Sequence, residues 1–143
     1  MLVLGSAAVD ISAQADRLTG TDLIASSNTT SPGRVSLSMG GVARNVAEAC
    51  QRILNACSSD LRKATMLVSL IGKDHFGRLL LEDVQQLGMR TDGIMQSGQS
   101  STACCNMVLD VTGDLVGGVA DMRIIETMEG SMVCAVCVRC GPS

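Results

Sequence analysis

The stretch "GGVARNVAEACQRI" at residues 40–53 decides the fold, because two glycines directly precede the pattern of an amphipathic helix. An alternating strand pattern, "VSLSM" at 35–39, comes immediately before the glycines. The spacing predicts an apolar helix face made of Val42, Val46, Ala49, Cys50, Ile53, Leu54 and Cys57. It predicts a solvent-facing side made of Arg44, Glu48, Gln51, Arg52 and Asn55. A strand, a glycine turn and a helix therefore follow one another here.

Outward from this unit, strands and helices alternate. The nearly continuous apolar run at 65–72 is typical of a parallel strand covered on both faces. A second helix follows, with Asp74 predicted as its N-cap and Gly88 as its C-terminal stop. A short apolar run at 2–5 predicts another buried strand. This order favours an α/β fold with a layered parallel sheet.

Some segments do not fit a parallel core. The half-polar strands near 11–16, 35–39 and 102–111 suit a small second sheet, and a hairpin joins the last of them to residues 115–120. Residues 126–143 have no clear hydrophobic period. A single strand–helix–strand unit provides too few strands and helices for a complete layered sheet. The sequence therefore predicts an α/β fold that is C-terminally incomplete.

Composition excludes several classes of protein. The formal net charge is -3, the pI is about 5.0, and one Phe is the sole aromatic residue, so we expect neither a nucleic-acid partner nor a membrane partner. The N-terminal apolar run is short and ends at Asp10, so the sequence predicts neither a signal peptide nor a membrane-spanning segment. We therefore expect the protein to reside in the cytoplasm. Seven cysteines without an export signal predict free thiols. We expect four of them to be core residues: Cys50, Cys57, Cys104 and Cys105.

Four residues are candidates for ligand contacts. Gly40 and Gly41 leave room for a ligand at the positive end of the following helix. Asn45 lies one turn in, and Asp10 ends the first strand, where open α/β sheets bind ligands. The alternative is a plain strand-to-helix turn with a solvated Asn and a turn-capping Asp. The spacing is neither the dinucleotide fingerprint nor a P-loop.

Together these segments resemble the ribokinase-like, or PfkB, carbohydrate kinases. "VLGSAAVDI" is similar to the family's opening strand and "GGVARNVAEA" to its first signature. "IGKDHFG" and "STACCNMVLDVTGDLVGGVADM" are similar to its next strand–helix segment and its lid hairpin. The ending "GDLVGGVADM" most resembles pseudouridine kinases, including fungal kinases fused to a glycosidase.

The resemblance implies a kinase that phosphorylates a hydroxyl of a sugar or nucleoside, with pseudouridine a candidate. It implies that Asp10, Gly40, Gly41 and Asn45 contact the substrate. The strands near 11–16, 35–39 and 102–111 would form a lid, with a contribution from Thr102. Pairing of lids between two subunits would give a homodimer.

The departures from the family concern catalysis. The first-signature helix runs on as "RILNACSSDLRKA", with a longer connection than the family has. The second signature, of D-T-x-G-A-G-D type, is missing, and with it the anion hole, the catalytic base and the implied site for ATP and Mg²⁺. Asp74 and His75 are a helix cap and a surface residue, not substitutes. We therefore expect residues 1–125 to be the N-terminal portion of a kinase domain, 126–143 a divergent tail, and the chain alone to be inactive.

Two other interpretations remain. "CAVCVRC" places Cys134, Cys137 and Cys140 at a spacing that can bind zinc or an iron–sulfur cluster, although no fourth ligand lies nearby. The favoured interpretation of these cysteines is a tail without a metal site. Alternatively, the chain is a non-catalytic remnant that binds a sugar or dimerises.

Overall fold

Strand β4 (Met66–Gly72) is buried along its whole length and is the centre of a three-stranded parallel sheet. It pairs with β1 (Leu2–Leu4) on one side and β5 (Ile94–Ser97) on the other. The computed structural model describes residues 1–17, 22, 30–58, 61 and 63–139. The buried parallel strand predicted at 65–72 is confirmed. The strand predicted at 2–5 forms, but at the sheet edge, where Leu2 and Leu4 are half exposed.

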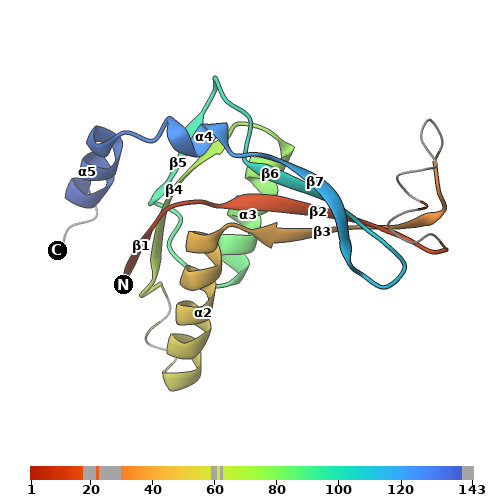
Figure 1. The fold of residues 1–143 in the computed structure, drawn as a ribbon. Helices are drawn as coiled ribbons and strands as arrows, with labels where there is room; N and C mark the ends of the chain where they lie inside the picture. The colour runs from red at the N-terminus through yellow and green to blue at the C-terminus, as the bar shows by residue number, and fades with distance from the viewer. Residues whose placement is uncertain (18–21, 23–29, 59–60, 62, 140–143) are drawn as a thin grey trace.

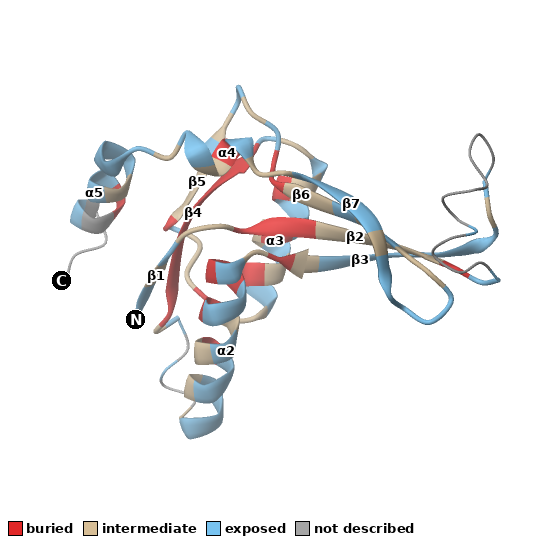
Figure 2. Ribbon diagram, in the orientation of Figure 1, coloured by how far each residue is buried: buried red, intermediate tan, exposed pale blue. Residues whose placement is uncertain are grey.

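Helices α2 (Val42–Cys57) and α3 (His75–Gln86) cover one face of this sheet (Figure 1). Successive side chains of a strand point to opposite faces, so alternate β4 residues face these helices. One core cluster joins the β4 side chains Leu67 and Ile71 to side chains of α2 and α3: Ala43, Ala47, Leu80 and Val84. In Figure 2, β4 and parts of α2 are coloured as buried.

Two C-terminal helices cover the opposite face of β4. Helix α4 (Arg123–Glu126) buries Ile124 against Leu70, and α5 (Gly130–Arg139) buries Val136 against Met66 and Val68. The tail therefore contributes to the core although its sequence has no clear period. The result is a helix–sheet–helix arrangement, which agrees with the predicted α/β class.

A second, four-stranded sheet extends away from the helices (Figure 1). Its strand order is β3 (Gly33–Gly40), β2 (Ala8–Ala15), β6 (Cys104–Leu109) and β7 (Leu115–Asp121). Strands β2 and β6 are parallel, and the other two pairs are antiparallel. All three segments predicted as half-polar strands lie in this one sheet.

The two faces of the second sheet differ in polarity. Register places Val35, Leu37, Val108 and Val119 on one face, where they are exposed, and Asp10 with Ser36 and Ser38 on the other. Close to the helices the apolar face packs against α3 through Val9, Ile11 and Met39. Farther out nothing in the described part of the chain covers it.

The face that α2 turns inward was predicted wrongly. Its buried residues are Ala43, Arg44, Ala47 and Gln51, whereas Val42 is 77% exposed and Ile53 is 63% exposed. The alanines allow α2 to approach the β1–β2 loop closely, since a Cβ on Gly5 would lie 3.0 Å from that of Ala43. Small side chains, rather than large ones, therefore mark the packed face.

Buried Gln51 is satisfied by polar partners. Its side-chain oxygen accepts from the Thr65 N–H at 3.0 Å, and its nitrogen donates to the Leu61 carbonyl at 3.2 Å. These bonds tie the helix to the connection that leads into β4. An amide with such partners can be buried at little cost.

The cysteines that the structure describes as free are Cys50, Cys57, Cys104, Cys105 and Cys134. The expectation that Cys57 is a core residue is wrong, because it lies at the exposed C-terminal end of α2. Cys50, Cys104 and Cys105 are partly buried. Among the residues that the structure covers, each helix is too short or too polar to cross a lipid bilayer.

Candidate functional site

Asp10 lies in β2 with its carboxylate directly over Gly40, the last residue of β3. Gly40 pairs with Ala8, two residues before Asp10, so the two positions lie on one face of the sheet. A Cβ on Gly40 would lie 2.1 Å from the Asp10 Oδ2 atom. The glycine therefore makes the room that the carboxylate occupies.

Gly41 has a different role in the chain path. Its φ of 94° lies in the region that favours glycine, and it is the N-cap of α2. A Cβ there would lie 2.6 Å from the Ser6 carbonyl oxygen, which accepts a hydrogen bond from the Arg44 N–H at 3.1 Å. Gly41 thus lets the first turn of α2 rest on the β1–β2 loop.

Asn45 is exposed in the first turn of α2, four residues after Gly41. Its N–H donates to the Gly41 carbonyl at 2.9 Å, and its side-chain oxygen accepts from Arg44 Nη1 at 3.1 Å. The structure thus brings Asp10 and Gly40 into direct contact and adds Gly41 and Asn45 through the turn. An acceptor carboxylate and a helix N-terminus thus lie at the same glycine turn, an arrangement that suits a polyhydroxyl ligand.

Arg44 is the site residue that sequence reasoning missed. It was predicted to face water, but it is 6% exposed and pairs with Asp83 of α3 at 2.6 Å. The available signal was its position beside Ala43 in a face of small residues. A search for large apolar residues at helical spacing does not detect a packed face made of small residues.

Asp74 caps α3 as predicted, and it also holds the start of the segment leading into β6. Its carboxylate accepts from the Gly77 N–H at 2.8 Å, the Thr102 N–H at 2.8 Å and the Thr102 hydroxyl at 2.7 Å. Burial opposes ionisation, but the hydrogen bonds from Thr102 and Gly77 outweigh it and lower the pKa of Asp74. Thr102, expected to contribute to a lid, is buried in this structural network.

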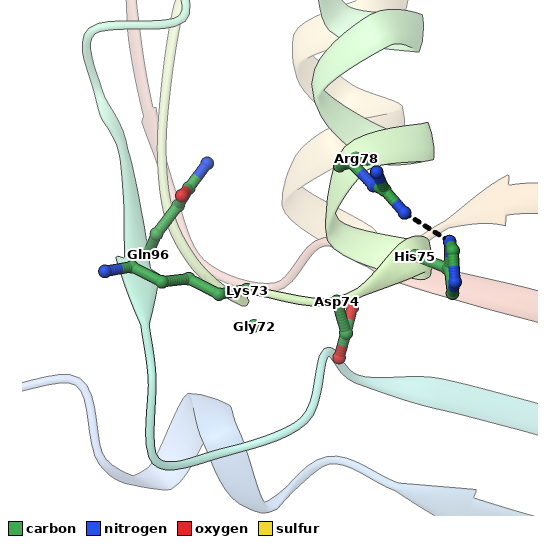
Figure 3. Close-up of a pocket in the computed structure, with 6 residues that line it drawn as sticks. All are labelled: Gly72, Lys73, Asp74, His75, Arg78 and Gln96. Carbon is green, nitrogen blue, oxygen red and sulfur yellow. Dashed lines mark hydrogen bonds between the residues drawn. The ribbon is translucent and has the colours of Figure 1, made fainter.

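A pocket of about 550 Å³ opens at the ends of β4 and β5. Gly72, Lys73, Asp74, His75, Arg78 and Gln96 line it (Figure 3). His75 is exposed and bonded to Arg78, as expected of a surface residue in the first turn. Asp10, Gly40, Gly41 and Asn45 do not line this pocket, so it is separate from the candidate substrate contacts.

In the described ranges no group of three His, Cys, Asp or Glu side chains could hold a metal ion. No segment of D-T-x-G-A-G-D type occurs in the sequence. Cys134 is exposed on α5, whereas Cys140 and the side chain of Cys137 lie outside the described residues.

The architecture is that of the ribokinase-like sugar kinases. Ribokinase from Giardia lamblia superposes with a TM-score of 0.77 at 21% identity, covering 96% of this chain and 40% of that one. Residues 1–117 match the pfkB family carbohydrate kinases. The chain belongs to this family, as the resemblance predicted.

Two curated relatives are pseudouridine kinases. The one from Escherichia coli K12 is 27% identical over 124 residues, which cover 87% of this chain and 35% of the relative. The one from Arabidopsis thaliana is 33% identical over 100 residues, which cover 70% of this chain and 24% of the relative. The chain thus spans between about a quarter and about a third of the length of these relatives.

Proposed function

We propose that this chain forms the substrate-binding portion of an ATP-dependent sugar or nucleoside kinase, with a ribose-like group as its ligand. The observation that carries the proposal is the Asp10 carboxylate packed on Gly40, beside the turn that begins α2. The match over residues 1–117 and the pseudouridine kinase relatives support the same assignment. Asp10, Gly40, Gly41 and Asn45 are the proposed contacts.

In this arrangement Asp10 accepts hydrogen bonds from ligand hydroxyl groups, because an ionised carboxylate can only accept. Asn45 contacts a second ligand atom from the first turn of α2. The polar face of the second sheet, with Ser36 and Ser38 beside Asp10, lies on the ligand's side and serves as the lid. Closure of the lid excludes water from the bound hydroxyl groups.

We propose phosphoryl transfer for a complete kinase domain of this family, not for this chain alone. Transfer needs a base and charge stabilisation at the γ-phosphate, and kinases of this family use ATP as the donor. The chain contains no second-signature segment to supply these groups. We therefore expect substrate binding without ATP-dependent turnover.

Calorimetric titration of the purified chain tests the proposal. The ligands are pseudouridine, ribose and 2-deoxyribose, and the matched variant is Asp10→Asn, which keeps the shape of the side chain and removes its charge. We expect binding of pseudouridine or ribose, and at least tenfold weaker binding by the variant, because bonds to a charged group are worth about 1.5–3 kcal/mol. Absence of binding to all three ligands, or equal binding by the variant, contradicts the proposal.

The exposed apolar face of the second sheet supports a second proposal, association of two copies through the lid. Val35 is 69% exposed, Leu37 55% and Val119 77%, and register places all three on one face. Exposed apolar side chains on one face of a sheet favour burial against a partner. A second copy of this chain presents the same complementary surface.

A further inference from the structure

The Arg44 guanidinium is buried between α2 and α3 rather than extended into solvent. Its Nε lies 3.1 Å and its Nη2 lies 2.6 Å from the Asp83 Oδ2 atom, and Nη1 contacts Glu48 one turn along α2. Two carboxylates thus compensate one buried cation. Burial of a guanidinium is costly unless its donors are satisfied, so these contacts fix the side chain in place.

The Nη1 group that contacts Glu48 also reaches the proposed ligand site. Nη1 donates to the Met39 carbonyl at 3.2 Å and to the Asn45 side-chain oxygen at 3.1 Å. Met39 directly precedes Gly40 and Gly41. Arg44 therefore touches both sides of the glycine turn, the end of β3 and the start of α2.

The contact decides which way the Asn45 amide faces. A guanidinium has five donors and no acceptor, so the amide oxygen must be the atom that faces it. The amide nitrogen then lies on the side away from Arg44, with two N–H groups for a ligand. Without the contact, either end of the amide could face a ligand.

We propose that Arg44 is a positioning residue that makes Asn45 a hydrogen-bond donor in the substrate site. The proposal rests on the proposed function. It assigns complementary roles to the two polar contacts, since Asp10 accepts from ligand hydroxyl groups while Asn45 donates to a ligand oxygen. A single hydroxyl group can donate to one and accept from the other, so the pair selects hydroxyl-bearing ligands over ethers and deoxy sugars.

A simple structural role for Arg44 makes a different prediction. If Arg44 only clamps α2 to α3, its loss weakens ligand binding by the same factor whether or not Asn45 is present. If it acts through Asn45, the loss depends on the Asn45 side chain. A double-mutant cycle separates these two cases.

The cycle combines Arg44→Lys with Asn45→Ala and measures pseudouridine binding by calorimetry. Lys keeps the positive charge beside Asp83 but lacks the planar fork that reaches two acceptors at once. We expect Arg44→Lys to weaken binding about tenfold in the parent chain and less than about twofold in the Asn45→Ala background. Equal losses in both backgrounds overturn the proposal.

Arg52→Lys is the matched control. Arg52 lies on the same helix and also pairs with Glu48, at 2.6 Å. Its side chain is 65% exposed, and it lies about two helical turns farther from Gly41 than Arg44 does. We expect this variant to bind pseudouridine as the parent does. A tenfold loss in the control would show that any Arg-to-Lys replacement on α2 weakens binding and would overturn the specific role of Arg44.

A second readout needs no ligand, so it separates failure of this inference from failure of the proposed function. The two side-chain amide protons of Asn45 are observed by NMR in the parent and in Arg44→Lys. We expect ¹⁵N relaxation to show a more ordered Asn45 side-chain amide in the parent than in the variant, with backbone resonances of α2 retained. Identical Asn45 signals in both proteins overturn the inference, even if pseudouridine does not bind.

Discussion

Gly40 and Gly41 are neighbours, yet the structure needs a glycine at each for a different reason. At Gly40 the nearest atoms to an added Cβ belong to the Asp10 carboxylate, which is the free end of a side chain. At Gly41 they belong to the backbone at Ser6 and Ala7, and φ is 94°. The first glycine therefore serves the proposed site, and the second serves the path of the chain.

Substitution separates these two roles. In Gly40→Ala the new Cβ displaces the Asp10 carboxylate, so we expect about tenfold weaker pseudouridine binding and about 1 kcal/mol of lost stability. In Gly41→Ala we expect a loss of about 2–3 kcal/mol in the free energy of unfolding, because backbone strain and overlap cannot be relieved by a side chain. Urea denaturation and calorimetry measure both. The reverse pattern, with Gly40→Ala the less stable variant, contradicts the account.

At this scale the sequence predicted the glycine turn, because glycines before a helix are a local signal, and it placed Asn45 in the first turn of that helix. The prediction that Asp10 ends the first strand is wrong, because β1 ends at Leu4 and Asp10 lies inside β2. It did not predict Arg44. Apolar periodicity favoured the Val42 and Ile53 face, whereas close approach at Ala43 determines which face is buried. That approach depends on Gly5, thirty-eight residues away in the sequence, whose position requires the tertiary fold.

Helix α3 begins at a network that joins three segments of the chain. Asp74 bonds to Gly77 in its own helix and to Thr102 before β6, and the Thr102 hydroxyl accepts from the Gly72 N–H at 2.9 Å. An N-cap is a local signal, so the sequence predicted Asp74. The partner Thr102 is a tertiary contact and was not predicted as one.

Loss of this network should destabilise the protein more than loss of a cap alone. Asp74→Ala removes the cap, worth about 1 kcal/mol, and two hydrogen bonds to Thr102 of about 1 kcal/mol each. We expect the free energy of unfolding to fall by about 2–3 kcal/mol in urea denaturation. The control Glu82→Ala, an exposed position in the same helix, should change it by less than about 0.5 kcal/mol. Equal effects of the two substitutions would contradict the role of Asp74.

The tail shows where element prediction fails. The parallel strand, predicted at 65–72 from a nearly continuous apolar run, and the helix at 42–57, predicted from its period, have closely predicted bounds, although the buried face of the helix was wrong. Helix α5 has no apolar stripe in its sequence, yet Val133 and Val136 pack on the sheet beside Met95. Packing against the sheet stabilises this helix, and the local sequence pattern does not predict that packing.

The whole molecule consists of a layered α/β body and a projecting second sheet with one apolar face. The body buries β4 on both sides, but β1 pairs only with β4 in the described structure. The chain spans 40% of a ribokinase that shares its fold. The sequence predicted both sheets because their strands differ in polarity. The alternation of polar and apolar residues could not predict that the apolar face of the second sheet is left uncovered.

Association of two copies is the prediction at this scale. Leu37→Lys places a charge on the exposed apolar face, so we expect size-exclusion chromatography to show a dimer for the parent and a monomer for the variant. Ser36→Lys is the control, because it adds the same charge to the opposite face of β3. A monomeric parent, or a dimer that persists in Leu37→Lys, contradicts association through this face.

The central claim is that Asp10, Gly40, Gly41 and Asn45 form a hydroxyl-binding site. Amide NMR of the labelled chain during titration with pseudouridine tests it most directly, because it locates the ligand residue by residue. The account predicts saturable shifts at Gly40, Gly41 and the Asn45 side-chain amide, and their loss in Asp10→Asn. Shifts confined to the pocket at Lys73 and His75, or no shifts at all, would contradict it.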